Sequence, residues 1–170
     1  MLGFLFRGLT PPATPAAALF DAVTREARMT RWYVGAAVPD TLDGRFAVLA
    51  TVAALTLVRL EQLGDSGTAL SVALTERFID VMEAEHRELG LGDPTLGKTV
   101  RKLVGSLARR TELWRAATAS EDGWAEAAAQ SLYQESPAPA PLTEASAGLK
   151  AFWARLELTS LAELSEGRIE

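Results

Sequence analysis

The stretch LDGRFAVLATVAALTLVRLEQL, residues 42–63, decides the fold class. Its spacing is helical, because apolar residues recur every three or four positions and not in strict alternation. Two faces of such a helix are apolar, one formed by Phe46, Leu49, Ala50, Ala53, Leu57 and Leu60 and the other by Val48, Val52 and Leu55. A helix that is apolar on two sides is buried on both, so this stretch predicts the central helix of a bundle.

Turn and capping signals divide the rest of the chain into further helices. Val38-Pro39 ends one segment, Gly64–Gly67 another, and Ser160 with Glu163 forms a capping-box pattern near the end. The predicted helices span about 15–28, 42–63, 68–89, 94–119, 121–134 and 143–158, with a short piece at 32–33 and a last turn after 160. Five to seven helices with short connections predict an all-α, single-domain helical bundle.

The domain organisation follows from length and proline placement. A chain of 170 residues is typical of one domain. Pro137, Pro139 and Pro141 predict a stiff extended connection. We therefore expect an amino-terminal segment 1–14, a helical domain 15–136, a Pro-rich connection 137–142, and carboxy-terminal helices 143–170 that pack on the same domain.

Composition excludes several function classes. The chain has no Cys, which removes disulfides and thiolate sites, and its net charge of −5 argues against a nucleic-acid partner. The longest apolar stretch, Phe46–Val58, is shorter than the ~20 residues that a membrane-spanning helix needs. The apolar run Leu2–Phe6 beside Arg7 fits either a docked terminus or a peripheral membrane contact.

Residue patterns that carry catalysis or bind metals are incomplete. Glu83 and His86 have the i, i+3 spacing of dimetal bundles, but the chain has no second His for a second pair. Gly92–Thr99 matches a phosphate-loop string, yet a predicted helix and not a strand precedes it, and Pro94 removes one backbone donor. No nucleophile elbow is present. We expect no enzyme activity, no metal and no cofactor.

A basic stripe stands out against the acidic average. It lies on the predicted helix 94–119 and consists of Lys98, Arg101, Lys102, Arg109 and Arg110. One interpretation is a solvated helix face that pairs with acidic neighbours. The other is a docking surface for an acidic or membrane-proximal partner.

Two segments in order resemble the ubiquinol–cytochrome c chaperone family. Val38-Pro39-Asp40-Thr41-Leu42-Asp43-Gly44-Arg45-Phe46 resembles its Pro-Asp-Thr-x-x-Gly-Arg-Phe signature. The segment from Asp80 through Arg87-Glu88-Leu89-Gly90-Leu91-Gly92-Asp93 resembles a second motif, followed by the basic helix. The resemblance covers Leu19 to Ala117. The candidate motif residues, whether binding or structural, are Pro39, Asp40, Thr41, Gly44, Arg45, Phe46, Asp80, Arg87, Glu88, Gly90, Gly92 and Asp93.

The resemblance implies a non-enzymatic assembly chaperone of the respiratory cytochrome bc complex that binds newly made cytochrome b. The expected partners are cytochrome b or other subunits of that complex, reached through the basic stripe. A small co-chaperone subunit and peripheral contact with a membrane stay open. The implied location is the cytoplasm at the inner face of a bacterial inner membrane, or the matrix side in a mitochondrion.

The alternative is a helical protein or enzyme that holds a lipid or isoprenoid in an apolar cavity. Such an enzyme needs carboxylates, for instance Asp80 and Glu83, that converge on the cavity.

Overall fold

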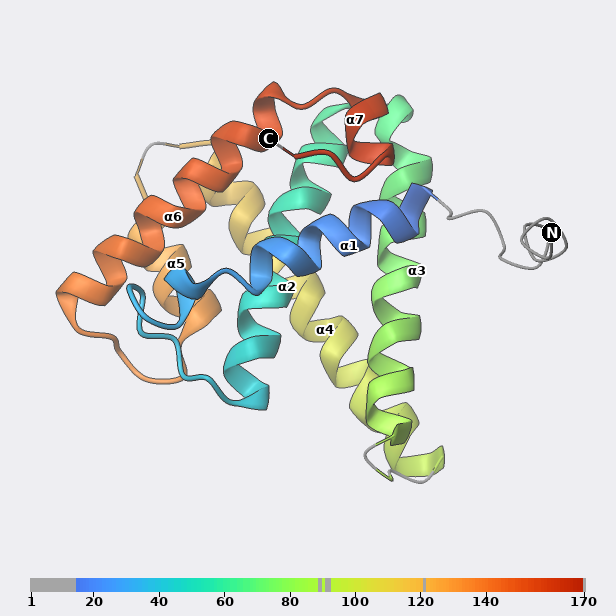
Figure 1. The fold of residues 1–170 in the computed structure, drawn as a ribbon, viewed down its shortest axis with the longest axis horizontal. Coiled ribbons are helices and arrows are strands. Elements are labelled where there is room, and N and C mark those ends of the chain that lie inside the picture. The colour runs from blue at the N-terminus through green and yellow to red at the C-terminus, as the bar shows by residue number, and fades with distance from the viewer. Residues whose placement is uncertain (1–14, 89, 91–92, 121, 170) are drawn as a thin grey trace, which may run out of the picture.

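A computed structural model describes residues 15–88, 90, 93–120 and 122–169, which form seven α-helices and one 3-10 helix (Figure 1). No β-strand occurs in these residues, so the predicted all-α bundle is confirmed. In chain order the elements are α1 Pro15–Ala27, η1 Thr30–Trp32, α2 Leu42–Gln62, α3 Asp65–Glu88, α4 Asp93–Thr118, α5 Trp124–Leu132, α6 Pro139–Leu158 and α7 Leu161–Ser165.

Helix α2 is the core of the bundle. Every side chain from Ala50 to Val58 is buried, and α1, α3, α4, α5 and α6 all pack against it. In Figure 1, α1 crosses in front of α2, while α4 runs behind it. The central position predicted from the two apolar faces is therefore confirmed.

Several helix boundaries differ from the prediction, and α5 spans only Trp124–Leu132 where 121–134 was predicted. Helix α3 begins at Asp65, so most of the Gly64–Gly67 turn is already helical, and only Gly64 has a positive φ, 63°. Helix α6 begins at Pro139, four residues before the predicted Thr143, so the Pro-rich connection is shorter than expected. Proline is tolerated in a first helical turn because its missing N–H has no intrahelical partner there.

Capping groups lie at several helix ends, and the capping box predicted at Ser160 and Glu163 is confirmed. The Thr41 hydroxyl accepts a hydrogen bond from Gly44 N at 3.2 Å, and Ser160 with Glu163 forms a complete capping box. Gly90 follows α3 with a φ of 83°, and its N–H donates to Arg87 O at 3.0 Å. Gly90 thus has the left-handed conformation that is common for a glycine just after a helix.

A buried carboxylate joins three elements on one side of α1. Glu26 of α1 is 8% exposed and pairs with Arg31 of η1 and with Arg155 of α6, the latter at 2.6 Å. The indole Nε1 of Trp32 donates to Glu26 O at 2.8 Å. These contacts fix η1 against α1 and α6, and the chain leaves η1 toward the start of α2.

Within the described part of the chain, no helix is long and apolar enough to cross a membrane.

Candidate functional site

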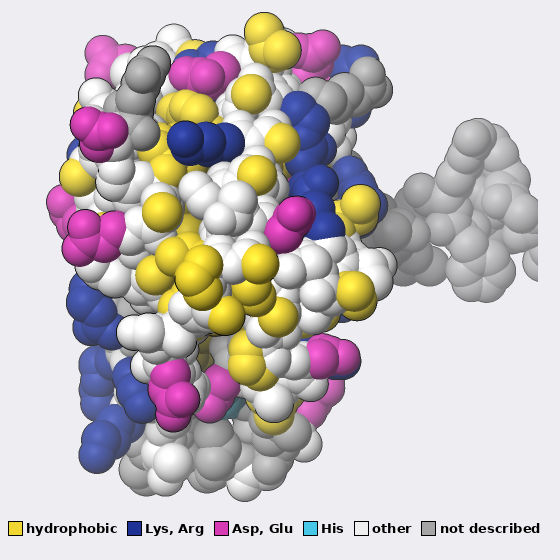
Figure 2. Space-filling model, turned by 90° about the vertical axis from the view of Figure 1, so that its left-hand side faces the viewer, with side chains coloured by type: hydrophobic (Ala, Val, Ile, Leu, Met, Phe, Trp, Pro, Cys, Tyr) yellow, Lys and Arg dark blue, Asp and Glu magenta, His cyan; other side chains and the backbone are white. Residues whose placement is uncertain are grey.

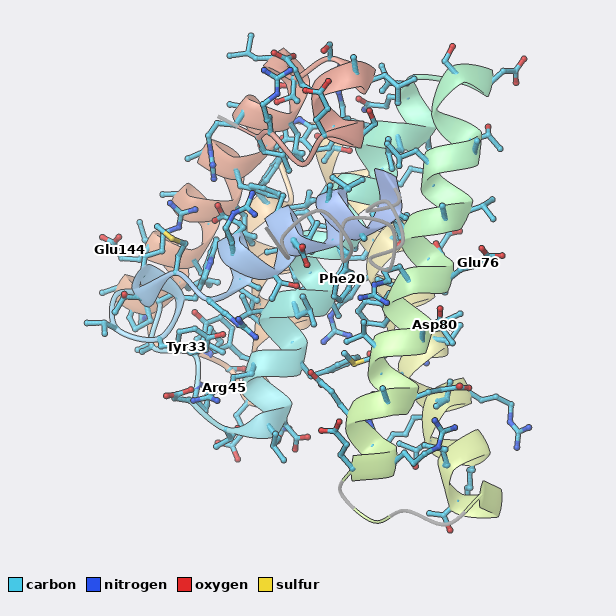
Figure 3. All side chains as sticks on the ribbon, turned by 45° about the vertical axis from the view of Figure 1, so that its right-hand side comes forward. Phe20, Tyr33, Arg45, Glu76, Asp80 and Glu144 are labelled. Carbon is cyan, nitrogen blue, oxygen red and sulfur yellow. The ribbon has the colours of Figure 1, made fainter. Side chains whose placement is uncertain are left out.

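An open groove of about 1070 Å³ lies beside α1, between the first half of α2 and the second half of α3. In Figure 3 it lies below α1, and Phe20 marks its α1 side. One side chain of α4, Leu103, also lines it. The residues that line the groove are Phe20, Asp21, Thr24, Ala27, Arg28, Tyr33, Asp40, Leu42, Asp43, Arg45, Phe46, Leu49, Arg77, Val81, Met82, Glu85, His86, Glu88 and Leu103.

Aromatic packing builds the apolar floor of the groove. The buried ring of Phe78 lies 6.5 Å from that of Phe20 and 6.2 Å from that of Phe46, centroid to centroid. Phe78 thus links α1, α2 and α3 beneath the groove. Leu42 stands at the edge with 72% of its surface exposed. An exposed leucine next to half-buried apolar neighbours offers surface that a partner can bury.

The rim of the groove carries both charges, with an acidic excess. Asp21, Asp43, Glu85 and Glu88 line it and form no ion pair among the described residues. The basic lining residues are Arg28, Arg45 and Arg77, and Arg45 is paired with Asp40. The groove therefore favours a ligand that combines apolar surface with positive charge.

The first motif segment forms the start of α2 and one edge of this groove. Asp40 accepts a hydrogen bond from Arg45 Nε at 2.6 Å, which holds the pKa of the Asp40 carboxyl below its usual range. Gly44 packs so tightly on Pro39 that a Cβ would lie 1.9 Å from the Pro39 carbonyl oxygen. Asp40 and Arg45 thus hold each other at the edge of the groove, Gly44 packs against the preceding backbone, and Phe46 contributes to the groove floor.

The second motif segment is only partly at the groove. Glu88 lines it, whereas Arg87 is exposed and Gly90 ends the helix. Asp80 is exposed and points away from α2 (Figure 3). The predicted motif residue Gly92 lies outside the described residues; Asp93 is the first residue of α4, and its side chain is not among the described ones.

Tyr33 and His86 both line the groove. The Tyr33 hydroxyl donates to Ala27 O at 2.9 Å, and burial, followed by the Asp40 carboxylate, raises the pKa of Tyr33. His86 Nδ1 lies 2.8 Å from Met82 O. A carbonyl oxygen only accepts, so Nδ1 carries a proton and Nε2 is left for other partners.

The basic stripe lies on α4 but not in the groove. Lys98, Arg101, Lys102 and Arg109 are exposed, and none forms an ion pair within the described residues. Arg110 is different, because its Nε and Nη2 donate to Ser131 O at 3.2 and 2.8 Å. Its guanidinium also lies 5.8 Å from the ring centroid of Phe46. Arg110 thus ties α4 to the end of α5.

The carboxylates required by the lipid-enzyme alternative do not meet in the groove. Neither Asp80 nor Glu83 lines it. In the part of the chain that the structure describes, no three His, Asp or Glu side chains cluster as metal ligands.

Several groove residues were not predicted to belong to a site from the sequence. They include Phe20, Arg28, Leu49, Val81 and Met82. A sequence signal exists for some of them, because Leu42, Phe46 and Leu49 follow each other at i, i+4 and i+7 on α2. That spacing places them on one face without showing that this face is left partly uncovered.

Fold and groove together define an all-α protein with a partly apolar groove on its surface. A sequence profile of the Ubiquinol-cytochrome C chaperone family matches residues 35–169, so the chain belongs to this family. The match includes the helices after Glu121, beyond the Leu19–Ala117 region of the resemblance noted above. The chain is also similar to the crystal structure of the Cbp3 homolog from Brucella abortus, with a TM-score of 0.76 and 25% identity. This similarity covers 100% of the chain and 96% of that one. No curated protein matches the chain.

Proposed function

We propose that this chaperone acts in assembly of the cytochrome bc complex by binding newly made cytochrome b, without catalysis, in the groove between α1, α2 and α3. Membership in the ubiquinol–cytochrome c chaperone family supports the assembly role. The observation that carries the binding site is the convergence of both motif segments on one groove, through Phe46 from the first and Glu88 from the second.

The chemistry of the groove suits a segment of a membrane protein before its insertion. Such segments are apolar, and their cytoplasmic flanks are rich in Lys and Arg. The apolar floor around Phe20 and Phe46 buries the first feature, and the unpaired carboxylates of Asp43 and Glu85 complement the second.

The lipid-binding alternative is less well supported. A site for a small apolar ligand buries most of that ligand's surface. Here the groove is only partly enclosed, and its rim carries charged side chains from three helices. The need for a small co-chaperone subunit stays a prediction, which copurification of a second small protein would test.

The test is capture of cytochrome b from detergent-solubilised membranes of a strain with an active bc complex, using the tagged protein. The groove variant Leu42→Ser/Val81→Ser removes apolar side chains at the rim and on the floor. Leu42 is 72% exposed and Val81 is partly exposed, so a client in the groove would bury further apolar surface on both, and we expect at least a ten-fold loss of captured cytochrome b.

A matched control keeps the substitution types and moves them elsewhere. Leu158 is 86% exposed, Val72 is 52% exposed, and neither lines the groove. Leu158→Ser/Val72→Ser should capture cytochrome b as well as the unmodified protein. Equal capture by both double variants would place the client outside the groove. Capture of no bc-complex subunit, together with unchanged bc-complex levels in a deletion strain, would contradict the chaperone function itself.

A further inference from the structure

We propose that α4 binds the surface of a bilayer containing anionic phospholipids through the exposed side chains of Lys98, Arg101, Lys102 and Arg109, here termed the cationic face. The proposal concerns a second surface, on the other side of α4 from the groove. It does not depend on the identity of the client.

The four cations form a continuous row. At 1.5 Å per residue, the positions from Lys98 to Arg109 extend over about 16 Å of helix, and their directions around the axis differ by at most about 100°. In Figure 2, Lys and Arg side chains follow the lower left edge of the molecule, on the side where α4 lies. A straight row of this kind can contact a flat surface with all four charges at once.

No acidic residue lies between the cations along the helix, and Glu112, one turn beyond Arg109, pairs with Arg115 at 2.6 Å. Residues 94–111 contain no Asp or Glu, and five Lys or Arg, of which only Arg110 is anchored internally. The whole chain has a net charge of −5, so the part outside 94–111 carries −10. Charge separation of this degree orients a molecule in the field of an anionic surface. Clusters of at least about four Lys or Arg on a helix are typical of anionic-lipid binding.

Small residues between the cations favour a flat partner. Gly105 and Ala108 lie within the cationic face, and a Cβ on Gly105 would meet only Arg109 Nη1, at 3.9 Å. Tertiary packing therefore does not explain the glycine, although glycine inside a helix costs about 1 kcal/mol relative to alanine. The short side chains leave only the flexible Lys and Arg standing above the helix surface.

The residue types on the cationic face argue against a protein as its partner. Specific protein interfaces have an apolar core that is enriched in aromatic residues. None of the large exposed apolar side chains of the described residues, Met29, Val34, Leu42, Val72 and Leu158, belongs to α4. Single-stranded nucleic acid is also disfavoured, because the cationic face has no aromatic side chain for base stacking.

The cationic face and the groove are separate surfaces of α4. Leu103, the only α4 residue among the described side chains that line the groove, lies about 100–160° around the helix axis from each of the four cations. A bilayer in contact with the cationic face would leave the groove open.

The test is flotation of the purified full-length protein with vesicles of phosphatidylcholine that contain one third phosphatidylglycerol, at low salt. The unmodified protein should float with these vesicles, remain behind with pure phosphatidylcholine, and be released by high salt. The pair Lys98→Gln/Lys102→Gln should weaken binding about thirty-fold. The quadruple variant, with Arg101→Gln and Arg109→Gln added, should abolish it.

The control pair Lys150→Gln/Arg168→Gln removes the same charge from α6 and from the segment after α7, and should bind vesicles normally. Circular dichroism verifies that all variants are folded, which Gln at exposed positions permits. Equal loss by the control pair, flotation of the quadruple variant, or failure of the unmodified protein to float would overturn the proposal. The quadruple variant could also lose binding to cytochrome b or to RNA while its vesicle binding stays unchanged. That result would assign the cationic face to a protein or an RNA and would likewise overturn the proposal.

Discussion

The carbonyl oxygen of Pro39 occupies the space that a side chain at position 44 would need. A Cβ on Gly44 would lie 1.9 Å from this oxygen and 3.0 Å from the carbonyl carbon. The contact sets the path by which the chain enters α2 and therefore the edge of the groove. A motif glycine at this position is thus explained by packing and not by contact with a client.

Gly44→Ala should destabilise the fold, because the backbone of Pro39 would have to move. We expect a loss of about 2–3 kcal/mol in the free energy of unfolding. Gly97→Ala is the control, since nothing lies within 4 Å of a Cβ there, and it should stabilise α4 by up to about 1 kcal/mol. Urea unfolding measures both values, and a Gly44→Ala protein as stable as the original would contradict the packing argument.

Neighbouring arginines on α4 should behave differently. Arg110→Gln removes the hydrogen bonds to Ser131 O and should cost about 2 kcal/mol of stability, because a buried carbonyl loses a charged donor. Arg109→Gln changes an exposed side chain and should leave stability within about 0.5 kcal/mol. Thermal unfolding distinguishes the two. Similar effects from both substitutions would mean that Arg110 does not anchor α5.

The ion pair at the start of α2 predicts a local pH response. Arg45 lowers the pKa of Asp40 mainly through its hydrogen bond. Any stabilisation from this pair is therefore present above the ordinary carboxyl pKa and is lost as the pH falls through the lowered pKa of folded Asp40. In Arg45→Gln, NMR titration should find the Asp40 pKa shifted upward. The pKa of Glu163, which Ser160 lowers, should stay unchanged.

The Glu26 cluster predicts a further loss of stability. Glu26→Gln leaves Arg31 and Arg155 without their carboxylate, and Glu26 itself is 8% exposed. Since both arginines remain partly solvated, we expect a cost of about 2 kcal/mol, less than for a fully buried pair. Glu76→Gln on the exposed side of α3 should have no measurable effect. Equal unfolding midpoints for the two variants would contradict the role assigned to Glu26.

Local rules predicted most of the helices. The boundaries of α2 and the capping box of Ser160 follow from spacing and capping chemistry, which act within a few residues. The start of α6 differs because Pro139 is compatible with both an extended segment and a first helical turn. Sequence alone does not decide between these two states, since packing of α6 against α5 and α2 selects the second.

The candidate site was predicted less completely. Periodicity placed Phe46 on an apolar face, and the family resemblance drew attention to Asp40, Arg45 and Glu88. Neither the periodicity nor the resemblance showed that α1 contributes Phe20 to the groove, or that α3 contributes Val81 and Met82. Arg110 looked equivalent to Arg109 in sequence because both are charged and adjacent. The tertiary structure distinguishes them, because Ser131 O of α5 accepts a hydrogen bond from Arg110 and not from Arg109.

The sequence by itself determined the all-α class, the central position of α2 and the uninterrupted positive charge of residues 94–111. Each of these depends on residue type and on spacing along a single helix. Only the tertiary structure decided where the groove lies and which cations remain free, because both depend on how α1, α3 and α5 approach α2 and α4. Side chains far apart in the chain cover or expose a surface only once the helices have packed, and local propensity does not encode that outcome.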